Sequence, residues 1–526
     1  MKTGLCTSGK AVSVLVAAAA LLLAAFAGMN VSSAPGQLVQ ASASPDVQAL
    51  GRYHFEYGTT QGWFAQPEGS LPTAAVVVTA TTAIAWSGSY SLRVGVHGDA
   101  GGWSAAAGLD DPAAAMSPTG TLTAHLYVPV TSTVAWVHFY VLDQHWAWSS
   151  APTATLQPGS WVTLTWDIST AVARPIHRLG VQFGGSAAGS GEATASLDDA
   201  LYLDAIDWSH PAYSHTLCAG AYLSGTWTAR FPDELAWLDG AGGKHAGLIN
   251  VFVGWTAPFP ADVVNAILDH QGTPMITWEP WVDLAQIPVG AYDAYLDEWA
   301  SAIAQTQSPV FMRWGHEMNG CIPGDDPPCW YPWGGDPEAY RAAWRYVHDR
   351  IEVVNGVENA VWAWTPNATQ GDLFADYGDY YPGDGYVDWV GASGFNAARK
   401  ATWDPKPPCL TFDDLFSPIL YDMAARYPKP QVVAEFASAC DNGCDKALWI
   451  AEAYHQALFH PRLRALVWFN VAKWEGQGAQ RKWVDWRIDC GGGCPDCTAA
   501  YARALAHPRY LCVACRAYLP LVPRSP

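Results

Sequence analysis

The sequence predicts an α/β protein in which an all-β sandwich precedes a (β/α)8 TIM barrel. Two observations predict this architecture. In the first part of the chain, short segments of alternating apolar and polar residues recur between turn signals. In the second part, apolar β-rich runs alternate with helical patterns. The 526 residues suffice for a leader and two or three domains, and a hydrophobic fraction of 50% suits a sizeable core.

Residues 1–43 have the composition of a signal peptide. Lys2 and Lys10 give a positive start, an apolar run covers Ala11–Ala27, and Ala41–Ala43 matches a small-residue cleavage site. The alternative is an uncleaved anchor, because the apolar run is near the shortest length that spans a bilayer. We expect cleavage and therefore a secreted protein with no membrane attachment afterwards, while association with the cell surface stays open.

Residues 50–210 are predicted to form the sandwich, which resembles a jelly roll. Gly, Pro, Ser and Asp punctuate its short alternating segments, as is typical of antiparallel sheets joined by tight turns. The segments are Ser91–Val96, Thr121–Val128, Ala135–Leu142, Trp161–Trp166 and Ser196–Asp207.

Residues 217–515 are predicted to form the barrel, and residues 516–526 a peripheral tail. Eight strands alternating with helices match the (β/α)8 repeat. The strands are expected at Ala219–Leu223, Leu248–Trp255, Pro274–Glu279, Val310–Glu317, Ala360–Trp364, Val387–Phe395, Gln431–Phe436 and Leu466–Phe469. The helices are expected at Ala261–His270, Tyr292–Thr306, Pro337–Val354, Phe412–Arg426, Ala447–Phe459 and Ala499–Ala506, with Asp336 as the N-cap of the third.

Composition excludes one class of partner and indicates another. A net charge of −20, without a basic footprint, argues against nucleic-acid binding. The 28 tryptophans and 23 tyrosines exceed what a core alone calls for, and such amphipathic rings suit surfaces that stack on sugars.

The cysteines predict disulfides, because the chain is expected to be exported. Twelve are present; Cys6 lies in the leader and the others lie from Cys218 onward, so an odd number remains after cleavage. Cys321 and Cys329 flank a loop that a disulfide could close. The alternative for the last four, Cys494, Cys497, Cys512 and Cys515, is a zinc ribbon, since each pair is spaced Cys-x2-Cys.

Two glutamates stand at the ends of predicted barrel strands, Glu317 on the fourth and Glu435 on the seventh. In this fold the carboxyl ends of the strands carry the chemistry. A pair of carboxyl groups, one protonated and one ionised, is what glycoside hydrolysis needs. Each glutamate alone is more simply a salt-bridge partner, but the pair on separate strands favours a catalytic site.

The segment Arg313–Gly320, which reads RWGHEMNG and is followed by WYPWG from Trp330, resembles the acid/base motif of glycoside hydrolase family 26. The best-known members of this family are endo-β-1,4-mannanases. His316 before Glu317 is characteristic, because related barrel families usually place Asn there. The resemblance continues at Thr277–Trp281, Trp364–Asn367, Val433–Phe436 and Trp468–Asn470.

The resemblance implies roles for these residues. Glu317 would be the acid/base and Glu435 the nucleophile of a retaining mechanism. His316 would sit at the cleavage subsite, and Trp330 would stack on a sugar if a disulfide closes the insert before it. Arg313, which should point into the barrel, is expected to hold Glu435.

Further substrate-binding candidates carry open alternatives. Trp278, Trp281 and Trp468 are each either a sugar platform or a core residue. Related enzymes commonly have a Tyr that bonds the nucleophile where this chain has Phe395, so Asn396 or another group would supply that bond.

The sandwich resembles jelly-roll carbohydrate-binding modules through Phe55-Glu56 and the segment Tyr202–Trp208. This resemblance makes Glu56 and Asp204 candidate ligands of a structural Ca²⁺, with solvated or capping acids as the alternative. It also makes a sugar platform of Trp136, Trp146 and Trp148.

Taken together, these resemblances imply a monomeric retaining β-glycoside hydrolase that acts on plant-type β-1,4-linked polysaccharide, most simply an endo-β-1,4-mannanase, and that needs no cofactor for catalysis. One alternative keeps the mechanism but changes the substrate to mixed-linkage β-glucan or xylan. A second is a catalytically inactive carbohydrate-binding protein.

Overall fold

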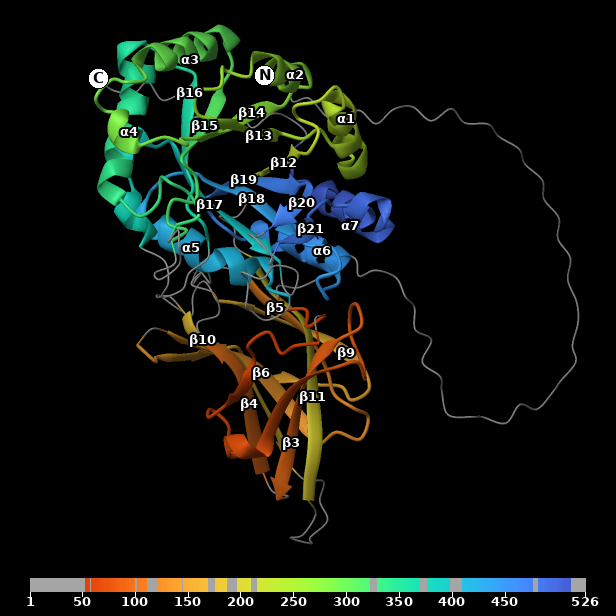
Figure 1. Cartoon of the computed structure of the whole chain (residues 1–526). Helices are drawn as coiled ribbons and strands as arrows, with labels where there is room; N and C mark the ends of the chain where they lie inside the picture. Colours follow the sequence, from red (N-terminus) through yellow and green to blue (C-terminus); the bar gives the residue numbers. More distant parts are fainter. Residues whose placement is uncertain are drawn as a thin grey trace, which may run out of the picture. The chain divides into compact units, whose positions relative to one another are not determined.

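A computed structural model describes most of the chain (Figure 1). The predicted leader and tail lie outside the described residues, as do Cys512 and Cys515. The described ranges are 53–56, 58–99, 102–110, 121–143, 145–168, 176–186, 196–209, 215–321, 329–368, 376–397, 409–475 and 481–511.

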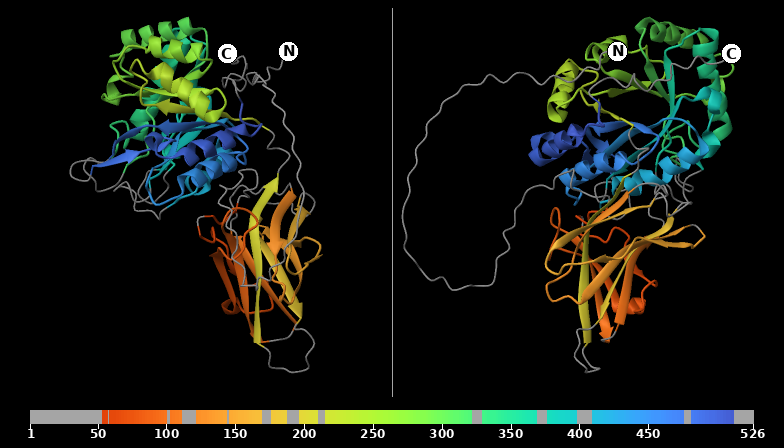
Figure 2. Two further views of the ribbon diagram at one scale, coloured as in Figure 1. Left: turned by 90° about the vertical axis from the view of Figure 1, so that its right-hand side faces the viewer. Right: turned by 180° about the vertical axis from the view of Figure 1, so that it is seen from behind.

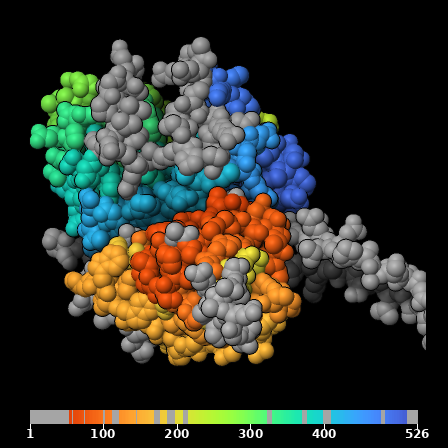
Figure 3. Space-filling view, turned by 90° about the horizontal axis from the view of Figure 1, so that it is seen from below, coloured from red at the N-terminus to blue at the C-terminus, as the bar shows by residue number. Residues whose placement is uncertain are grey.

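The N-terminal part is a sandwich of two antiparallel sheets, as predicted. One sheet has the order β1-β4-β10-β6-β7, with β8 paired to β6, and the other has the order β2-β3-β11-β5-β9. Inward residues such as Val94, Phe139 and Leu201 are fully buried between the sheets. The sandwich residues form one continuous surface in Figure 3. The strands are β1 Phe64–Gln66, β2 Val76–Thr81, β3 Ser91–Asp99, β4 Gly102–Asp110, β5 Thr121–Tyr127, β6 Val134–Asp143, β7 Trp148–Ser150, β8 Ala154–Thr155, β9 Trp161–Asp167, β10 Ile176–Ser186 and β11 Ser196–Ser209.

The C-terminal part is a closed barrel of eight parallel strands in chain order, β12 to β19, again as predicted. The helices lie outside the ring of strands (Figure 2). The strands are β12 Cys218–Leu223, β13 Leu248–Gly254, β14 Thr273–Glu279, β15 Val310–Trp314, β16 Ala360–Trp364, β17 Trp389–Asn396, β18 Gln431–Ser438 and β19 Leu463–Asn470. The helices are α1 Phe231–Gly242, α2 Ala261–Asp269, α3 Asp293–Thr306, α4 Pro337–Asp349, α5 Phe412–Arg426, α6 Lys446–Ala457 and α7 Pro495–Ala506.

Alternation along each barrel strand separates two cores. One set of side chains, including Met275, Phe311 and Val467, fills the barrel interior. The other set, including Ile276, Met312 and Leu466, packs against the surrounding helices. A side chain's position in this alternation therefore decides whether it can reach a site inside the mouth of the barrel.

In the C-terminal part, the structure adds helix α1 and a hairpin to the predicted strands and helices. Helix α1 was missed because Pro232, Gly240 and Gly242 interrupt its helical pattern. A hairpin of β20 (Ala472–Glu475) and β21 (Lys482–Asp485) follows β19. The predicted cap of α4 is present, since the Asp336 carboxylate accepts a hydrogen bond from the backbone N–H of Ala339.

Disulfides join the cysteines of the barrel domain. Within the described residues they pair Cys321 with Cys329, Cys409 with Cys444, Cys440 with Cys490, and Cys494 with Cys497. The first closes the insert as expected. The last replaces the zinc-ribbon alternative for Cys494 and Cys497, because a disulfide sulfur is not a thiolate ligand. No helix in the described part of the chain is long and apolar enough to cross a membrane.

Candidate active site

The backbone turns sharply after β15 and brings the Glu317 carboxyl group into the barrel mouth. β15 ends at Trp314, earlier than predicted, because Gly315 (φ 52°) and Glu317 (φ 51°) adopt left-handed conformations. The N–H of Glu317 donates to the carbonyl of Thr365, just beyond β16, at 2.9 Å. Such a strained φ at a non-glycine residue is typical of functional sites.

Glu435 reaches the barrel interior because β18 contains a bulge. Ala392 and Ser393 are neighbours on β17, yet they pair with Val433 and Glu435, so β18 gains one residue there. Ala434 lines the interior, and the bulge lets the next side chain, Glu435, face inward as well.

Arg313 holds the Glu435 carboxylate, as predicted. Its guanidinium is fully buried on β15, and Nη1 lies 3.2 Å from Glu435 Oε1. Three hydroxyl groups fix the guanidinium itself: Arg313 donates to Thr365 Oγ1 at 2.6 Å, to Thr277 Oγ1 at 3.0 Å and to Ser393 Oγ at 2.6 Å. A rigid and permanently charged guanidinium group thus lies beside Glu435, one of the two carboxyl groups.

This asymmetry places the proton of the pair on Glu317. Burial, followed by repulsion from the Glu435 carboxylate, raises the pKa of Glu317 to about 7. Burial also raises the pKa of Glu435, but Arg313 is the largest opposing influence and favours its ionised form. One protonated and one ionised carboxyl group is the arrangement that glycoside hydrolysis needs.

His316 is a neutral imidazole in an aromatic setting. Burial, then the charge of Arg313, lowers its pKa well below the usual value. Its ring centroid lies 4.9 Å from that of Tyr331 and 5.8 Å from that of Phe252. Among the described residues, nothing hydrogen-bonds to its Nδ1, and its carbonyl accepts from Trp333. A buried nitrogen without a partner suits a role in binding a hydroxyl group.

Two of the predicted sugar platforms are accessible. Trp281 is 53% exposed, and its ring stands edge-on to Trp333 at 5.1 Å. Trp330 is 38% exposed, and it directly follows the Cys321–Cys329 disulfide that closes the insert. Its ring packs over Gly320, where a Cβ atom would lie 2.2 Å from it.

Three other predicted binding residues face away from the barrel interior, and for Trp278 and Trp468 this matches the core alternative. Trp278 has no exposed surface and stacks on Trp299 of α3 at 3.9 Å. Trp468 is also fully buried and donates to the carbonyl of Trp486. Asn396 is buried and donates to Ser438 Oγ at 3.0 Å, so Arg313 and not Asn396 contacts Glu435.

The sequence interpretation missed two charged residues near the pair. Glu279, the last residue of β14, has its pKa raised by burial, while a hydrogen bond from Trp281 opposes the shift. Its strand-end position was a signal that could have identified it. Lys473 on β20 lies over the Phe469 ring at 5.0 Å, and its charge lowers the pKa of Glu317 and Glu435. No motif pointed to Lys473.

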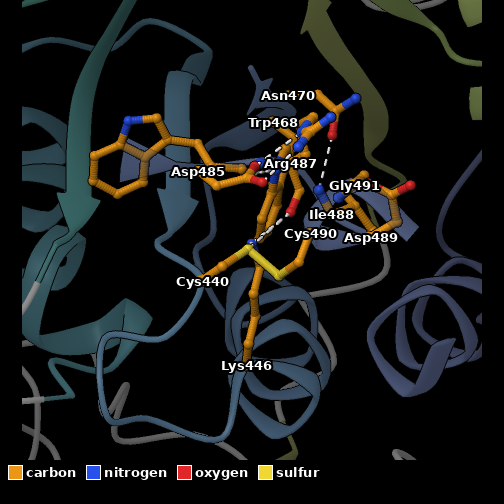
Figure 4. Close-up of polar contacts among 11 residues, drawn as sticks. Cys440, Lys446, Trp468, Asn470, Asp485, Arg487, Ile488, Asp489, Cys490 and Gly491 are labelled. Atoms are coloured by element: carbon orange, nitrogen blue, oxygen red, sulfur yellow. Dashed lines mark hydrogen bonds and ion pairs between the residues drawn. A yellow bond between two sulfur atoms is a disulfide. The ribbon is translucent and has the colours of Figure 1, made fainter. Parts of the chain in front are cut away.

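Residues 485–490 form a strap that packs beside Trp468, whose indole N–H donates to the carbonyl of Trp486 (Figure 4). The disulfide of Cys440 with Cys490 ties the strap to the end of β18. Lys446, at the start of α6, donates to the carbonyl of Arg487 at 2.6 Å and lies under the Trp468 ring at 5.6 Å. Burial lowers the pKa of this lysine to about 7.

The two acids of the sandwich, Glu56 and Asp204, accept hydrogen bonds from backbone amides. Asp204 Oδ2 accepts from the N–H groups of Trp86 and Ser87. Glu56 accepts from those of Ser89 and Tyr90 with both oxygens. These hydrogen bonds are those of capping acids, while each carboxylate oxygen keeps a second lone pair. The assignment of Glu56 and Asp204 as Ca²⁺ ligands therefore stays a prediction.

The aromatic cluster predicted on the sandwich is partly accessible. Trp146 is 56% exposed and Trp148 is 42% exposed. The Trp148 ring stacks on that of Tyr140 at 4.4 Å, and the Trp136 ring stacks on that of His138 at 5.5 Å. Exposed, supported rings of this kind suit contact with the apolar face of a sugar.

A closed barrel with two buried carboxyl groups at the carboxyl ends of its strands has the layout of a two-carboxylate glycosidase. The family model described as "Glycosyl hydrolase family 26" matches residues 261–404, and the one described as "Mannanase, galactose-binding domain-like" matches residues 53–199. The barrel thus contains the match to glycosyl hydrolase family 26, in agreement with the resemblance of the His-Glu motif.

Curated relatives match over part of their length. Endoglucanase H of Acetivibrio thermocellus is 31% identical over 294 residues, which is 53% of this chain and 30% of the relative. Mannan endo-1,4-beta-mannosidase of Bifidobacterium adolescentis is 27% identical over 128 residues, which is 22% of this chain and 12% of the relative. The chain therefore spans less than a third of the length of these relatives.

Solved structures give a more distant match. The catalytic domain of the Bacillus sp. JAMB-750 GH26 endo-beta-1,4-mannanase is 16% identical, with a TM-score of 0.42, and the match covers 57% of this chain and 88% of that chain.

Proposed function

We propose that the chain is a retaining β-glycoside hydrolase that cleaves β-1,4-linked polysaccharide, most simply as an endo-β-1,4-mannanase. One observation carries the proposal: Glu317 and Glu435 share a buried site, but only Glu435 is in contact with Arg313. The raised pKa of Glu317 keeps its proton available near neutral pH. The ion pair keeps Glu435 available as a nucleophile.

In the first step, Glu435 attacks the anomeric carbon while Glu317 protonates the departing glycosidic oxygen. The negative charge of Glu435 disappears in the glycosyl-enzyme, so the pKa of Glu317 falls. Glu317 then takes a proton from the attacking water, and its raised pKa is restored when the free enzyme re-forms. The catalytic cycle needs no metal or organic cofactor, because two carboxyl groups supply both the acid and the nucleophile.

Mannan is favoured over the alternatives by the combination of domains. The family matched by the sandwich is described by its link to mannanases, and one relative of the barrel is a mannan endo-1,4-beta-mannosidase. Endoglucanase H keeps β-glucan as the second candidate, and xylan remains the third. We propose that the exposed rings of Trp146 and Trp148 make the sandwich a carbohydrate-binding module.

We further propose a monomer that is secreted after removal of residues 1–43. The disulfides of the barrel support an extracellular location, because such bonds persist in oxidising compartments.

The test incubates the purified chain with galactomannan, glucomannan, mixed-linkage β-glucan and xylan, and measures new reducing ends. Glu317→Gln and Glu435→Gln run alongside Glu358→Gln, a control at an exposed glutamate. Release from mannans alone that is lost only in the first two variants supports the proposal. Release from β-glucan or xylan moves the substrate to an alternative. Binding without release from any polysaccharide contradicts hydrolysis and leaves a carbohydrate-binding protein.

A further inference from the structure

Three potential metal ligands converge at the end of the barrel opposite the candidate active site. Asp239 lies near the end of α1, and His245 follows three residues before β13 begins. His270 caps α2, three residues before β14 begins. The segments that lead into strands lie at the amino ends of the barrel, whereas chemistry in this fold occurs at the carboxyl ends. The cluster is therefore separate from Glu317 and Glu435.

The imidazole rings of His245 and His270 both contact the same carboxylate oxygen of Asp239. Asp239 Oδ2 lies 2.5 Å from His245 Nδ1 and 3.1 Å from His270 Nε2. The three ligand atoms all lie within 4.8 Å of one another, and the two rings are nearly perpendicular with centroids 5.7 Å apart. Within the described part of the chain, this is the group of His, Cys, Asp and Glu side chains that meets the geometry of a metal site.

The surroundings hold the ligands in this arrangement. The second oxygen of Asp239 accepts from the N–H of Ala246 at 2.9 Å, which orients the carboxylate and leaves Oδ2 for the imidazoles. Apart from its 3.1 Å contact with Asp239 Oδ2, the buried His270 Nε2 makes no hydrogen bond to any described residue. The nearby cation, Lys244, is turned to other acceptors, since its Nζ donates to the carbonyls of His507 and Tyr510.

Two imidazoles and a carboxylate match the ligands of zinc and its neighbours among the transition metals. In a tetrahedral site with bonds of about 2.1 Å, neighbouring ligand atoms stand roughly 3.4 Å apart. The oxygen and His270 are already near that spacing. His245 would move outward by about 1 Å to reach it, and its side chain, which is 50% exposed, has the space to do so.

We propose that Asp239, His245 and His270 form a binding site for a divalent transition-metal ion, best suited to Zn²⁺. Water completes the coordination, so the protein supplies three ligands and one position stays open to solvent. The ion joins the end of α1 to the end of α2, and its binding stabilises the folded barrel by mass action. This site is independent of the proposed hydrolase activity.

The test uses the full chain without a histidine tag, stripped with a chelator and then titrated with Co²⁺ and Zn²⁺. We expect one Co²⁺ per chain, with visible absorption bands that report nitrogen and oxygen ligands. Zn²⁺ should displace the cobalt and raise the midpoint of thermal unfolding by several degrees, of the order of 2–4 °C per kcal/mol. Metal retained after gel filtration is counted by mass spectrometry.

His245→Gln and His270→Gln each remove one ligand and should weaken binding at least tenfold, while activity on polysaccharide is unchanged. His97→Gln is the matched control, because His97 forms a comparable exposed contact with Asp198 but lacks a second imidazole. Stoichiometric binding that only the first two variants lose supports the site. Two results overturn it: no retained metal in the parent chain, or equal retention in the parent and in both variants.

Discussion

Arg313 contacts Glu435 and also donates to three hydroxyl groups, those of Thr277, Ser393 and Thr365, so its position does not depend on the carboxylate. The positive charge is in place before substrate arrives. A preorganised charge beside only one of two buried carboxyl groups makes the pair unequal, and the proposed roles of Glu317 as acid and Glu435 as nucleophile rest on this inequality.

The first prediction concerns the alkaline side of the pH profile. Because the pKa of Glu317 is raised to about 7, kcat/KM for polysaccharide should fall about tenfold per pH unit once pH rises above that value. A dinitrophenyl glycoside needs no proton on its leaving group, so its kcat/KM should stay level over the same range. An identical decline for both substrates would contradict Glu317 as the acid.

The second prediction is that the catalytic acid costs stability. The folded pKa of Glu317 lies above its usual value of 4.5, so the parent chain loses stability as pH rises from about 4.5 to about 7. Glutamine does not titrate. Glu317→Gln should therefore unfold less readily than the parent at pH 8, by up to roughly 3 kcal/mol, and the difference should vanish near pH 4. Urea unfolding at both pH values measures it; a variant that is less stable at pH 8 would count against the buried-proton account.

The third prediction concerns Arg313→Lys. Lysine keeps the charge but cannot bond three hydroxyl groups and a carboxylate in one plane. We expect kcat to fall about 10²- to 10³-fold and the acidic limb of the pH profile to move upward, because Glu435 becomes easier to protonate. Arg350→Lys is the control, since Arg350 pairs with Asp293 and Asp297 near the surface. Matching profiles for the two variants would remove the special role of Arg313.

The fourth prediction separates platform from core tryptophans. Trp281→Ala and Trp330→Ala should raise KM roughly two- to tenfold each, with little loss of stability, because both rings are exposed. Trp278→Phe should leave KM unchanged and lower the thermal midpoint, because Trp278 stacks on Trp299 in the core. Steady-state kinetics and thermal unfolding of the same preparations test the distinction. A raised KM in Trp278→Phe would show that this ring reaches substrate after all.

The fifth prediction concerns Lys446, the buried lysine that donates to the carbonyl of Arg487. The pKa of Lys446 falls from 10.5 to about 7 on folding, so between these values the unfolded chain binds a proton that the folded chain does not. The stability of the parent should therefore rise relative to Lys446→Met, by roughly 2 kcal/mol from pH 7 to pH 9. Lys482→Met, at an exposed lysine, should show no such slope. A flat difference for both variants would mean that Lys446 stays charged in the folded state.

The sequence was sufficient for the architecture because periodicity and strand-end position are local signals. The glutamates, the Arg313 ion pair and the disulfide around the insert could all be predicted from spacing, motif and charge. Trp278 could have been excluded in the same way: it alternates with Thr277 and Glu279, and Thr277 faces Arg313. Because successive side chains of a strand point to opposite faces, Trp278 must point outward and pack against the surrounding helices.

Other features depend on backbone irregularities that no residue pattern carries. The bulge in β18 turns Glu435 inward directly after Ala434, against simple alternation. The position of Lys473 depends on a hairpin outside the eight-strand repeat. Lys446 and the Asp239 cluster gain their environments from segments distant in sequence, so tertiary packing alone brings them together.

The central claim, that Glu435 is the nucleophile and Glu317 the acid, is tested most directly by trapping the glycosyl-enzyme. The parent chain and Glu317→Ala are incubated with a 2-deoxy-2-fluoro glycoside of dinitrophenol, digested, and examined by mass spectrometry. The account predicts one added glycosyl group on the peptide containing β18, attached to Glu435, in both proteins. Attachment to Glu317 in the parent chain, or inactivation without any covalent adduct, would contradict it.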